Sequence, residues 1–280
     1  MSKTIQIYSA ESKVRKADDV IRDMARGLVK GRYIAYRLAR NNIAGEYSRS
    51  LLGFFWDFAD PLVLAIIFYI LRQGKVFSTG ETNMPYAVYL IFGLLMYQSF
   101  VNATMWTINV LNQSRNLITQ QKLPPESLLL SVFLRAMFFA IFRIAVMLLF
   151  ALFLGSYSAI GMIKFLLAYP VLILAGMSIG VFLAPFNAVY RDVGRFVGMI
   201  LVPLRFISPV LFVLPKTPVY EAINSVNSFA LIMMNLRSLA TLNTTEYLGL
   251  TMIHCAVLFL FGLVGWFIFH VSVPVLSERA

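Results

Sequence analysis

The sequence has few of the residues that build disulfide-linked, metal-binding or redox sites. Its 280 residues include one cysteine, Cys255, and two histidines. A single cysteine excludes a disulfide within the chain, and no cluster of thiolates can form around a metal. Charged residues are also scarce, at 13%, which is about half of the share that soluble domains have. These shortages exclude a cysteine-rich scaffold and a soluble globule.

Apolar residues take the place of the missing charges. They make up 59% of the chain, and the mean hydropathy is +0.76. Because a helix crosses a bilayer in about 20 residues, six apolar stretches are long enough to span, and they cover residues 54–72, 86–110, 128–154, 161–185, 196–214 and 247–272. The sequence therefore predicts an all-α integral membrane protein whose six transmembrane helices form one domain over residues 51–276.

Positive charge is distributed unevenly along the chain. Eleven of the 24 Lys and Arg residues lie within residues 1–50, which also lack the apolar core of a secretory signal peptide. Cytoplasmic loops of membrane proteins carry an excess of Lys and Arg. If the amino terminus is cytoplasmic, sixteen Lys and Arg face the cytoplasm and four face the opposite side. This asymmetry predicts that both termini are cytoplasmic.

Residues 18–47, before the first apolar stretch, have a helical pattern. Apolar residues such as Val20 and Met24 recur at four-residue spacing among many Arg and Lys residues. This pattern predicts an amphipathic helix at the membrane surface, with its basic face against anionic headgroups. Gly27 and Gly31 are expected to interrupt the helix.

Three connections between spans are long enough to have a role of their own. They are a cytoplasmic coupling loop at 111–127, a second cytoplasmic loop at 186–195 and an outer segment at 215–246. The outer segment contains a moderately apolar stretch, 230–242, that is too short to cross a membrane. It predicts a re-entrant or surface helical hairpin on the outer side, before the last span.

The 111–127 loop is the best candidate for contact with a partner protein. It predicts a short helix over 112–122, which Pro124-Pro125 separate from the next span. The chain has no G-x-x-x-x-G-K-[ST], H-E-x-x-H or G-x-S-x-G motif. We therefore expect that the chain binds no cofactor and does not hydrolyse nucleotide itself. If it transports a substrate actively, the energy must come from a partner that contacts the cytoplasmic loops. The candidate contact residues are Arg115, Leu117, Ile118 and Lys122 in this loop and Arg191 and Asp192 in the second loop.

Three arginines, Arg135, Arg143 and Arg205, lie inside apolar stretches. An arginine in hydrocarbon costs about 2.5–3.5 kcal/mol on insertion scales, so each should face water, protein or a substrate path. No Asp or Glu lies within these stretches to pair them, which leaves their charge available to an anion such as a phosphate. The alternative is that they snorkel or bond to free backbone carbonyls. The missing carboxylates also argue against a proton-coupled secondary transporter.

Aromatic residues form a stripe along the second apolar stretch, within an arc of about 140°. Aromatic rings can stack on sugar faces without a fixed hydrogen-bond geometry, so the stripe is a candidate lining for a glycan passage. The alternative is ordinary interfacial Tyr and lipid-facing Phe. The candidates are Tyr89, Phe92, Tyr97 and Phe100 in the stripe, Phe68 in the first stretch, and Phe139 and Phe142 in the third.

Four short motifs follow one another along the chain. They are Arg49-Ser50-Leu51-Leu52-Gly53 with Trp56 and Pro61, Leu123-Pro124-Pro125-Glu126, Asn187-Ala188-Val189-Tyr190-Arg191-Asp192-Val193, and Ser208-Pro209-Val210-Leu211-Phe212. In this order they resemble the permease subunits of type-2 ABC exporters, in particular those that export O-antigen, capsule or teichoic acid polysaccharides. The resemblance covers residues 30–272, with Asn227-Ser228 where many relatives have Asn-Pro.

The resemblance implies a homodimer of six-span subunits with a channel between them, driven by two copies of an ATPase subunit. It also implies that 20–45 and 112–122 contact the ATPase and that short outer helices over 217–243 cover the channel. The expected substrate is a glycan linked to undecaprenyl or another lipid, and the expected location is a bacterial inner membrane. No nucleic acid partner is expected.

The hypothesis from the sequence is thus the transmembrane subunit of an ATP-driven exporter of a lipid-linked polysaccharide such as O-antigen. Two alternatives stay open. One is an exporter of the same fold that moves a drug or small lipid, which a continuous aromatic-lined channel would argue against. The other is a membrane-embedded glycosyl- or acyltransferase using Asp57 or Asp60 with a histidine, which glycan chemistry by the purified chain without an ATPase would favour.

Overall fold

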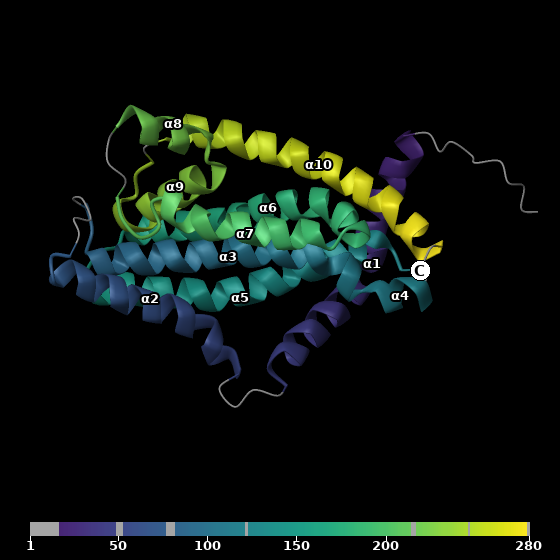
Figure 1. Ribbon diagram of the computed structural model, residues 1–280, viewed down its shortest axis with the longest axis horizontal. Coiled ribbons are helices and arrows are strands. Elements are labelled where there is room, and N and C mark those ends of the chain that lie inside the picture. Colours follow the sequence, from purple (N-terminus) through teal and green to yellow (C-terminus); the bar gives the residue numbers. More distant parts are fainter. Residues whose placement is uncertain are drawn as a thin grey trace, which may run out of the picture.

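The computed structural model describes residues 17–48, 53–76, 82–120, 123–213, 217–245 and 247–278. Every element within these ranges is a helix (Figure 1). The elements are α1 (Ala17–Tyr47), the short 3-10 helix η1 (Gly53–Phe55), α2 (Trp56–Gln73), α3 (Tyr86–Gln113), α4 (Arg115–Gln120), α5 (Pro125–Phe153), α6 (Ala159–Val189), α7 (Asp192–Ile207), α8 (Pro218–Val226), α9 (Ser228–Leu242) and α10 (Leu248–Glu278). The predicted all-α class is confirmed.

Four of the described helices, α3, α5, α6 and α10, are long and apolar enough to cross a membrane. They coincide with the second, third, fourth and sixth predicted stretches. The other two stretches also form helices, but α2 includes Asp57, Asp60 and Arg72 within 18 residues, and α7 has only 16 residues. The chain is therefore a multi-pass membrane protein, and spanning by α2 and α7 remains a prediction.

The helix α7 ends earlier than the sequence predicts. The apolar stretch runs over 196–214, whereas the helix stops at Ile207. Ser208 has an extended backbone, with φ −87° and ψ 154°, because the ring of Pro209 disfavours a helical conformation at the residue before it. The apolar residues that follow form a turn instead of continuing the helix.

The helix α3 lies at the centre of the bundle and packs against α2, α5, α6, α7 and α9. Its closest neighbour, α6, approaches at Gly176 and Gly180. An alanine Cβ at these positions would lie 2.7 Å from the backbone oxygen of Phe100 and 2.8 Å from that of Thr104. Small residues at this spacing let two helices approach closely, so the glycines of α6 determine how tightly it packs against α3.

The helix α1 packs along α5 through a stripe of small residues. Gly27, Gly31, Ala35 and Ala39 recur every four residues, and all four are buried. The prediction that the two glycines interrupt the helix is wrong, because α1 continues through both. A Cβ at Gly27 would collide with the carboxylate of Glu126 on α5. The glycines therefore allow α5 to approach, while the Arg and Lys residues of α1 face outward.

The segment between α7 and α10 folds into two short helices, α8 and α9, as the sequence and the resemblance predict for 217–243. Asn227 joins them: its side-chain oxygen caps α9 by accepting from the amide of Ala230, at 3.1 Å. Its amide nitrogen donates to Ser208 Oγ at 2.8 Å, so the hairpin is tied to the end of α7. The re-entrant position of this hairpin remains a prediction.

Candidate functional site: a polar cleft between α2 and α7

Arg143 on α5 is fully buried and paired with a carboxylate. Its Nε and Nη2 donate to the two carboxylate oxygens of Asp57 on α2, at 2.9 and 2.7 Å, and its Nη1 donates to Ser99 Oγ at 3.1 Å. The side chain of Arg143 is 1% exposed. The prediction that Arg143 is available to an anion is therefore wrong in this structure. A bidentate pair of this kind is a strong and geometrically specific contact.

Arg135, two turns earlier on α5, is also paired. Its Nη2 donates to Glu46 Oε2 on α1 at 2.8 Å. The guanidinium lies over the ring of Trp106, 3.9 Å from the ring centroid. The carboxylate again comes from a different helix, so the prediction that the charge of Arg135 is available to an anion is wrong in this structure as well.

The remaining charged residue of α5, Glu126, is fully buried in the first turn of that helix. Its Oε1 lies 2.5 Å from Nδ1 of His270 on α10. Its Oε2 lies against Gly27 and has no hydrogen-bond partner within the described residues. This carboxyl thus joins α1, α5 and α10 close to α4. Two features of the sequence bear on this contact: the motif that contains Glu126, and the histidines, His254 and His270, of the last apolar stretch.

Arg205 on α7 differs from the arginines of α5, because no carboxylate lies within ion-pair distance of it in the described part of the chain. It lines a cleft of about 260 Å³ between α2, α3 and α7. Its guanidinium lies over the Tyr97 ring, 4.7 Å from the centroid, and its Nε is buried without a described hydrogen-bond partner. The lining residues are Asp60, Pro61, Leu94, Tyr97, Gln98, Val101, Asn102, Gly198, Leu201, Val202 and Arg205.

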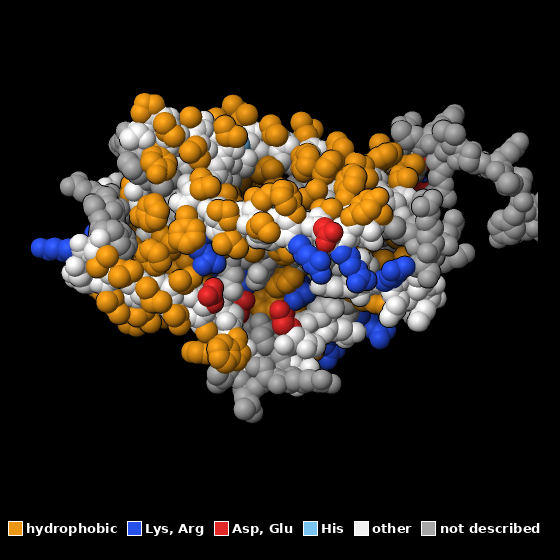
Figure 2. Space-filling model, in the orientation of Figure 1, with side chains coloured by type: hydrophobic (Ala, Val, Ile, Leu, Met, Phe, Trp, Pro, Cys, Tyr) orange, Lys and Arg blue, Asp and Glu red, His pale blue; other side chains and the backbone are white. Residues whose placement is uncertain are grey.

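Besides Arg205 Nε, the α2–α7 cleft has a second buried polar atom without a hydrogen-bond partner in the described chain, on Gln98. The Gln98 Nε2 donates to the backbone oxygen of Asp57 at 2.9 Å and to its Oδ1 at 3.2 Å. The Gln98 Oε1 is buried without a hydrogen-bond partner among the described residues. Figure 2 shows acidic and basic side chains around a hollow between α2 and α7, on a mostly hydrophobic face. A cation, a carboxylate and two amides are groups that bind anions and hydroxyls.

Most of the candidate aromatic residues pack inside the helix bundle. Tyr89, Phe92, Tyr97, Phe100 and Phe139 are buried. The hydroxyl of Tyr97 donates to Leu201 O on α7 at 2.7 Å, and that of Tyr89 donates to Pro209 O at 2.8 Å. The stripe therefore holds α3 against α7 in this structure, with Tyr97 also at the cleft. Phe142 is 40% exposed and Phe68 is half-buried, and a role for any of these rings in a passage stays a prediction.

Asn187, the first residue of the motif that covers 187–193, holds the turn between α6 and α7. It is buried, its Nδ2 donates to Ile108 O on α3 at 3.1 Å, and its Oδ1 accepts from the amide of Gly194 at 2.8 Å. On the other side, Asn112 Nδ2 donates to Asn187 O at 3.0 Å. The motif thus fixes the start of α7 against the end of α3, a role that its position in the sequence alone did not reveal.

Arg237 on α9 is one of the four Lys and Arg residues that the charge distribution places on the outer side, and the structure buries it. Both terminal nitrogens donate to Pro209 O at 3.0 Å, and the guanidinium lies 3.8 Å from the centroid of the Tyr89 ring. Burial lowers the pKa of the Arg237 guanidinium from its ordinary value. The residue joins the hairpin to α3 and to the turn after α7.

The candidate ATPase contacts lie at the same end of the bundle as α1 (Figure 1). The predicted short helix is confirmed as α4, whereas Lys122 lies outside the described residues. Arg115 is exposed and Leu117 is half-buried. Ile118 packs against the core of the chain, which leaves less of its side chain for a partner than predicted. In the second loop, Arg191 and Asp192 are both exposed.

The described helices and the polar cleft among them are those of a multi-pass membrane protein, and no group of three or more metal-ligating side chains lies within the described ranges. No protein-family model matches the sequence. The chain is similar to curated proteins named O-antigen export system permease protein RfbA. One from Myxococcus xanthus is 24% identical over 189 residues, which are 68% of this chain and 72% of that protein.

Two further proteins of the same name come from Klebsiella pneumoniae. One is 24% identical over 215 residues, which are 75% of this chain and 81% of the relative. The other is 21% identical over 239 residues, or 83% and 89% of the two chains. The similarity therefore extends over most of the chain and agrees with the resemblance that the motifs indicate.

Proposed function

We propose that this chain is the transmembrane subunit of an ATP-driven ABC exporter that moves a lipid-linked polysaccharide, such as O-antigen, across a bacterial inner membrane. The similarity to three permeases of O-antigen export supports this function. Within the structure, the observation that supports it best is the α2–α7 cleft. Its Arg205 faces a cavity without an ion-pair partner in the described chain, as a group that receives an anionic substrate should.

The contacts of the acidic and histidine residues argue against the enzyme alternative. Asp57 is committed to Arg143. His270 bonds to Glu126 and His254 bonds to Ser228 Oγ at 2.7 Å. A general acid or base must reach the proton that it transfers, and neither histidine has Asp57 or Asp60 as its described partner. The similarity to permeases named for O-antigen export supports a glycan exporter over an exporter of drugs or small lipids.

Export by the intact system is the direct test of the function. The chain is expressed with its ATPase in a host strain that lacks its own O-antigen permease, and surface polysaccharide is measured with an antibody to the glycan. We expect export with the active ATPase and none with an ATPase variant that cannot hydrolyse ATP. Glycan synthesis without export in the strain with the active ATPase would refute the transport function.

The proposed topology has six spans, including α2 and α7, and two cytoplasmic termini. In Figure 1, α1, α4 and the carboxyl-terminal end of α10 lie at one end of the bundle, and α8 and α9 lie at the other. Single cysteines at Thr217 and Asn116, in a Cys255→Ser background, test the orientation with an impermeant thiol reagent. We expect labelling of intact cells at Thr217 and labelling at Asn116 only after lysis. The reverse pattern would overturn the topology.

The working assembly is proposed to be a homodimer with two ATPase subunits that bind ATP and Mg²⁺. The helix α4 lies between α3 and α5 in the chain, so a push on it would move both helices as a rigid body. Leu117→Asp places a charge at the proposed contact. We expect the ATPase to co-purify poorly with this variant while the permease keeps its abundance. Undiminished co-purification and export would move the contact to α1 or to the 186–195 loop.

A further inference from the structure

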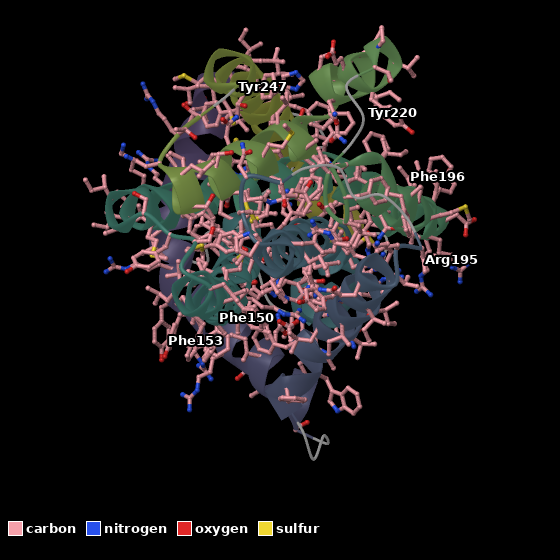
Figure 3. The ribbon with its side chains drawn as sticks, turned by 90° about the vertical axis from the view of Figure 1, so that its left-hand side faces the viewer. Phe150, Phe153, Arg195, Phe196, Tyr220 and Tyr247 are labelled. Carbon is pink, nitrogen blue, oxygen red and sulfur yellow. The ribbon has the colours of Figure 1, made fainter. Side chains whose placement is uncertain are left out.

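One face of α7 connects its amino-terminal end to the α2–α7 cleft. At 100° per residue, Arg191, Arg195, Gly198, Val202 and Arg205 fall within an arc of about 80°. Gly198, Val202 and Arg205 line the cleft, and Arg191 and Arg195 are exposed. Figure 3 shows Arg195 directed away from the bundle at the edge of α7. The two exposed arginines therefore lead along a single helix face to the buried one.

The exposed arginines are free to exchange partners. Arg195 Nη1 lies 3.2 Å from Asp192 Oδ1, but the two side chains are 82% and 89% exposed, and a pair of this kind holds its partners weakly. Within the described ranges Arg191 has no ion pair. An anion with two charges could displace Asp192 from Arg195, because arginine binds phosphate oxygens in a bidentate way.

The glycine between the charges is not required by packing. A Cβ at Gly198 would meet only Met105 Cε, at 3.7 Å, which is an ordinary contact. An alanine would therefore fit the fold, and glycine costs about 1 kcal/mol in a helix relative to alanine. Because glycine has no side chain, Gly198 leaves the surface of α7 between Arg195 and Arg205 open. Ten residues of helix separate the two arginines by about 15 Å, about half of a hydrocarbon core of about 30 Å.

We propose that the lipid-linked glycan carries a diphosphate between its lipid and its first sugar, and that this face of α7 is an anion-binding track for that diphosphate. Arg191 and Arg195 bind the diphosphate at the membrane surface, and Arg205 binds it again in the cleft. Gln98 Oε1 and Asp60, on the other sides of the cleft, accept hydrogen bonds from the hydroxyls of the first sugar. The proposal rests on the proposed function and adds the residues, and their order, along the path.

Binding to the purified full-length chain tests the track without transport. The chain is reconstituted in nanodiscs of neutral phosphatidylcholine, and the affinity for farnesyl diphosphate is measured by microscale thermophoresis. We expect Arg205→Gln and the double variant Arg191→Gln with Arg195→Gln each to weaken binding about five- to tenfold. Lys164→Gln is the matched control, because this exposed lysine bonds to Asn243 away from α7, and it should leave the affinity unchanged.

A second variant tests the path between the arginines. Gly198→Leu places a side chain on the surface of α7 between the arginines and changes neither charge. It should therefore weaken binding about as much as Arg205→Gln does. Adding Arg205→Gln to it should then change little. The fold of each variant is checked by its melting temperature in the same nanodiscs. Wild-type affinity in Arg205→Gln and in the double arginine variant would overturn the proposal.

Two further measurements identify the source of the anion and distinguish the anion site from the export function. If phosphatidylglycerol in the discs competes as well as farnesyl diphosphate binds, the face is a headgroup site for bilayer lipids and the diphosphate track is wrong. If the chain binds farnesyl diphosphate as expected but exports no polysaccharide with its ATPase, the proposed function fails and the anion site stands. If the triple arginine variant exports at the wild-type rate, the track fails and the function stands.

Discussion

The helices α5 and α7 both carry charged residues among apolar ones, but they use them differently. Each of the three charged residues of α5 meets an opposite charge or a histidine on another helix: Glu126 meets His270, Arg135 meets Glu46, and Arg143 meets Asp57. Arg205 of α7 shares its cleft with Asp60 but forms no ion pair in the described chain. The same kind of residue joins helices in one region and stays open in the other.

The difference follows from the cost of burying a charge. An unpaired charge away from water is expensive, whereas a bidentate pair with further hydrogen bonds recovers most of that cost. On α5 the pairs fix the positions of α1, α2 and α10, so these charges have little capacity left for a ligand. On α7 the charge faces a cavity and can bind an anion without first breaking a pair. A charged residue in a transmembrane helix therefore indicates a binding site only when its partners are known.

The largest effect is expected from breaking the pair of Arg143. In Arg143→Gln the carboxylate of Asp57 stays buried without its cation, which should destabilise the protein by about 3–5 kcal/mol. The measurement is the fraction that remains folded and monodisperse in detergent as temperature rises. Asp57→Asn in the same chain removes the orphaned charge and should restore part of the loss. A stable single variant would mean that the charges of α5 do not hold the fold.

A smaller loss is expected at Arg135, where Glu46 is partly exposed. Arg135→Gln removes a charge-assisted hydrogen bond and the contact over Trp106, which together should cost about 1.5–3 kcal/mol. A double-mutant cycle with Glu46→Gln measures the coupling between the two side chains. Strictly additive effects in that cycle would show that the pair contributes nothing and that Arg135 resembles Arg205.

The contact between Gly27 and Glu126 can be tested with two glycines of the same helix. Both Gly27→Ala and Gly45→Ala improve helix propensity. A Cβ at Gly27 collides with the Glu126 carboxylate, whereas one at Gly45 meets nothing within 4 Å. Overpacking of this kind costs about 1–3 kcal/mol, so only Gly27→Ala should lower the melting temperature. Equal melting temperatures would contradict the close approach of α1 and α5.

The smallest effect on stability, with a large effect on export, is expected at Arg205. Arg205→Gln loses the contacts with Tyr97, of which the one with the ring contributes about 0.5–1 kcal/mol, while glycan export in cells should fall at least tenfold at equal abundance. Arg205→Lys keeps the charge and should retain part of the export. If Arg205→Gln destabilises the protein as much as Arg143→Gln, the distinction between the two helices disappears.

Much of the helical framework could be predicted from the sequence because its signals are local. Long apolar runs placed α3, α5, α6 and α10 within a few residues of their observed bounds. Pro124-Pro125 predicted the break after α4. The four-residue spacing of Val20 and Met24 predicted α1, although Gly27 and Gly31 turned out to be contacts and not interruptions. Each of these patterns depends on residues that are near one another in the chain.

The sequence by itself thus determined that this is a membrane protein of apolar helices with a basic amphipathic helix before them, because hydropathy and charge act through composition and short-range periodicity. Only the tertiary structure decided which charges are free. The partners of Arg143, Arg135 and Glu126 are 86, 89 and 144 residues away along the chain, so no periodicity connects them. A carboxylate neutralises an arginine only when the two side chains are close in space, and how the helices pack determines which side chains are close.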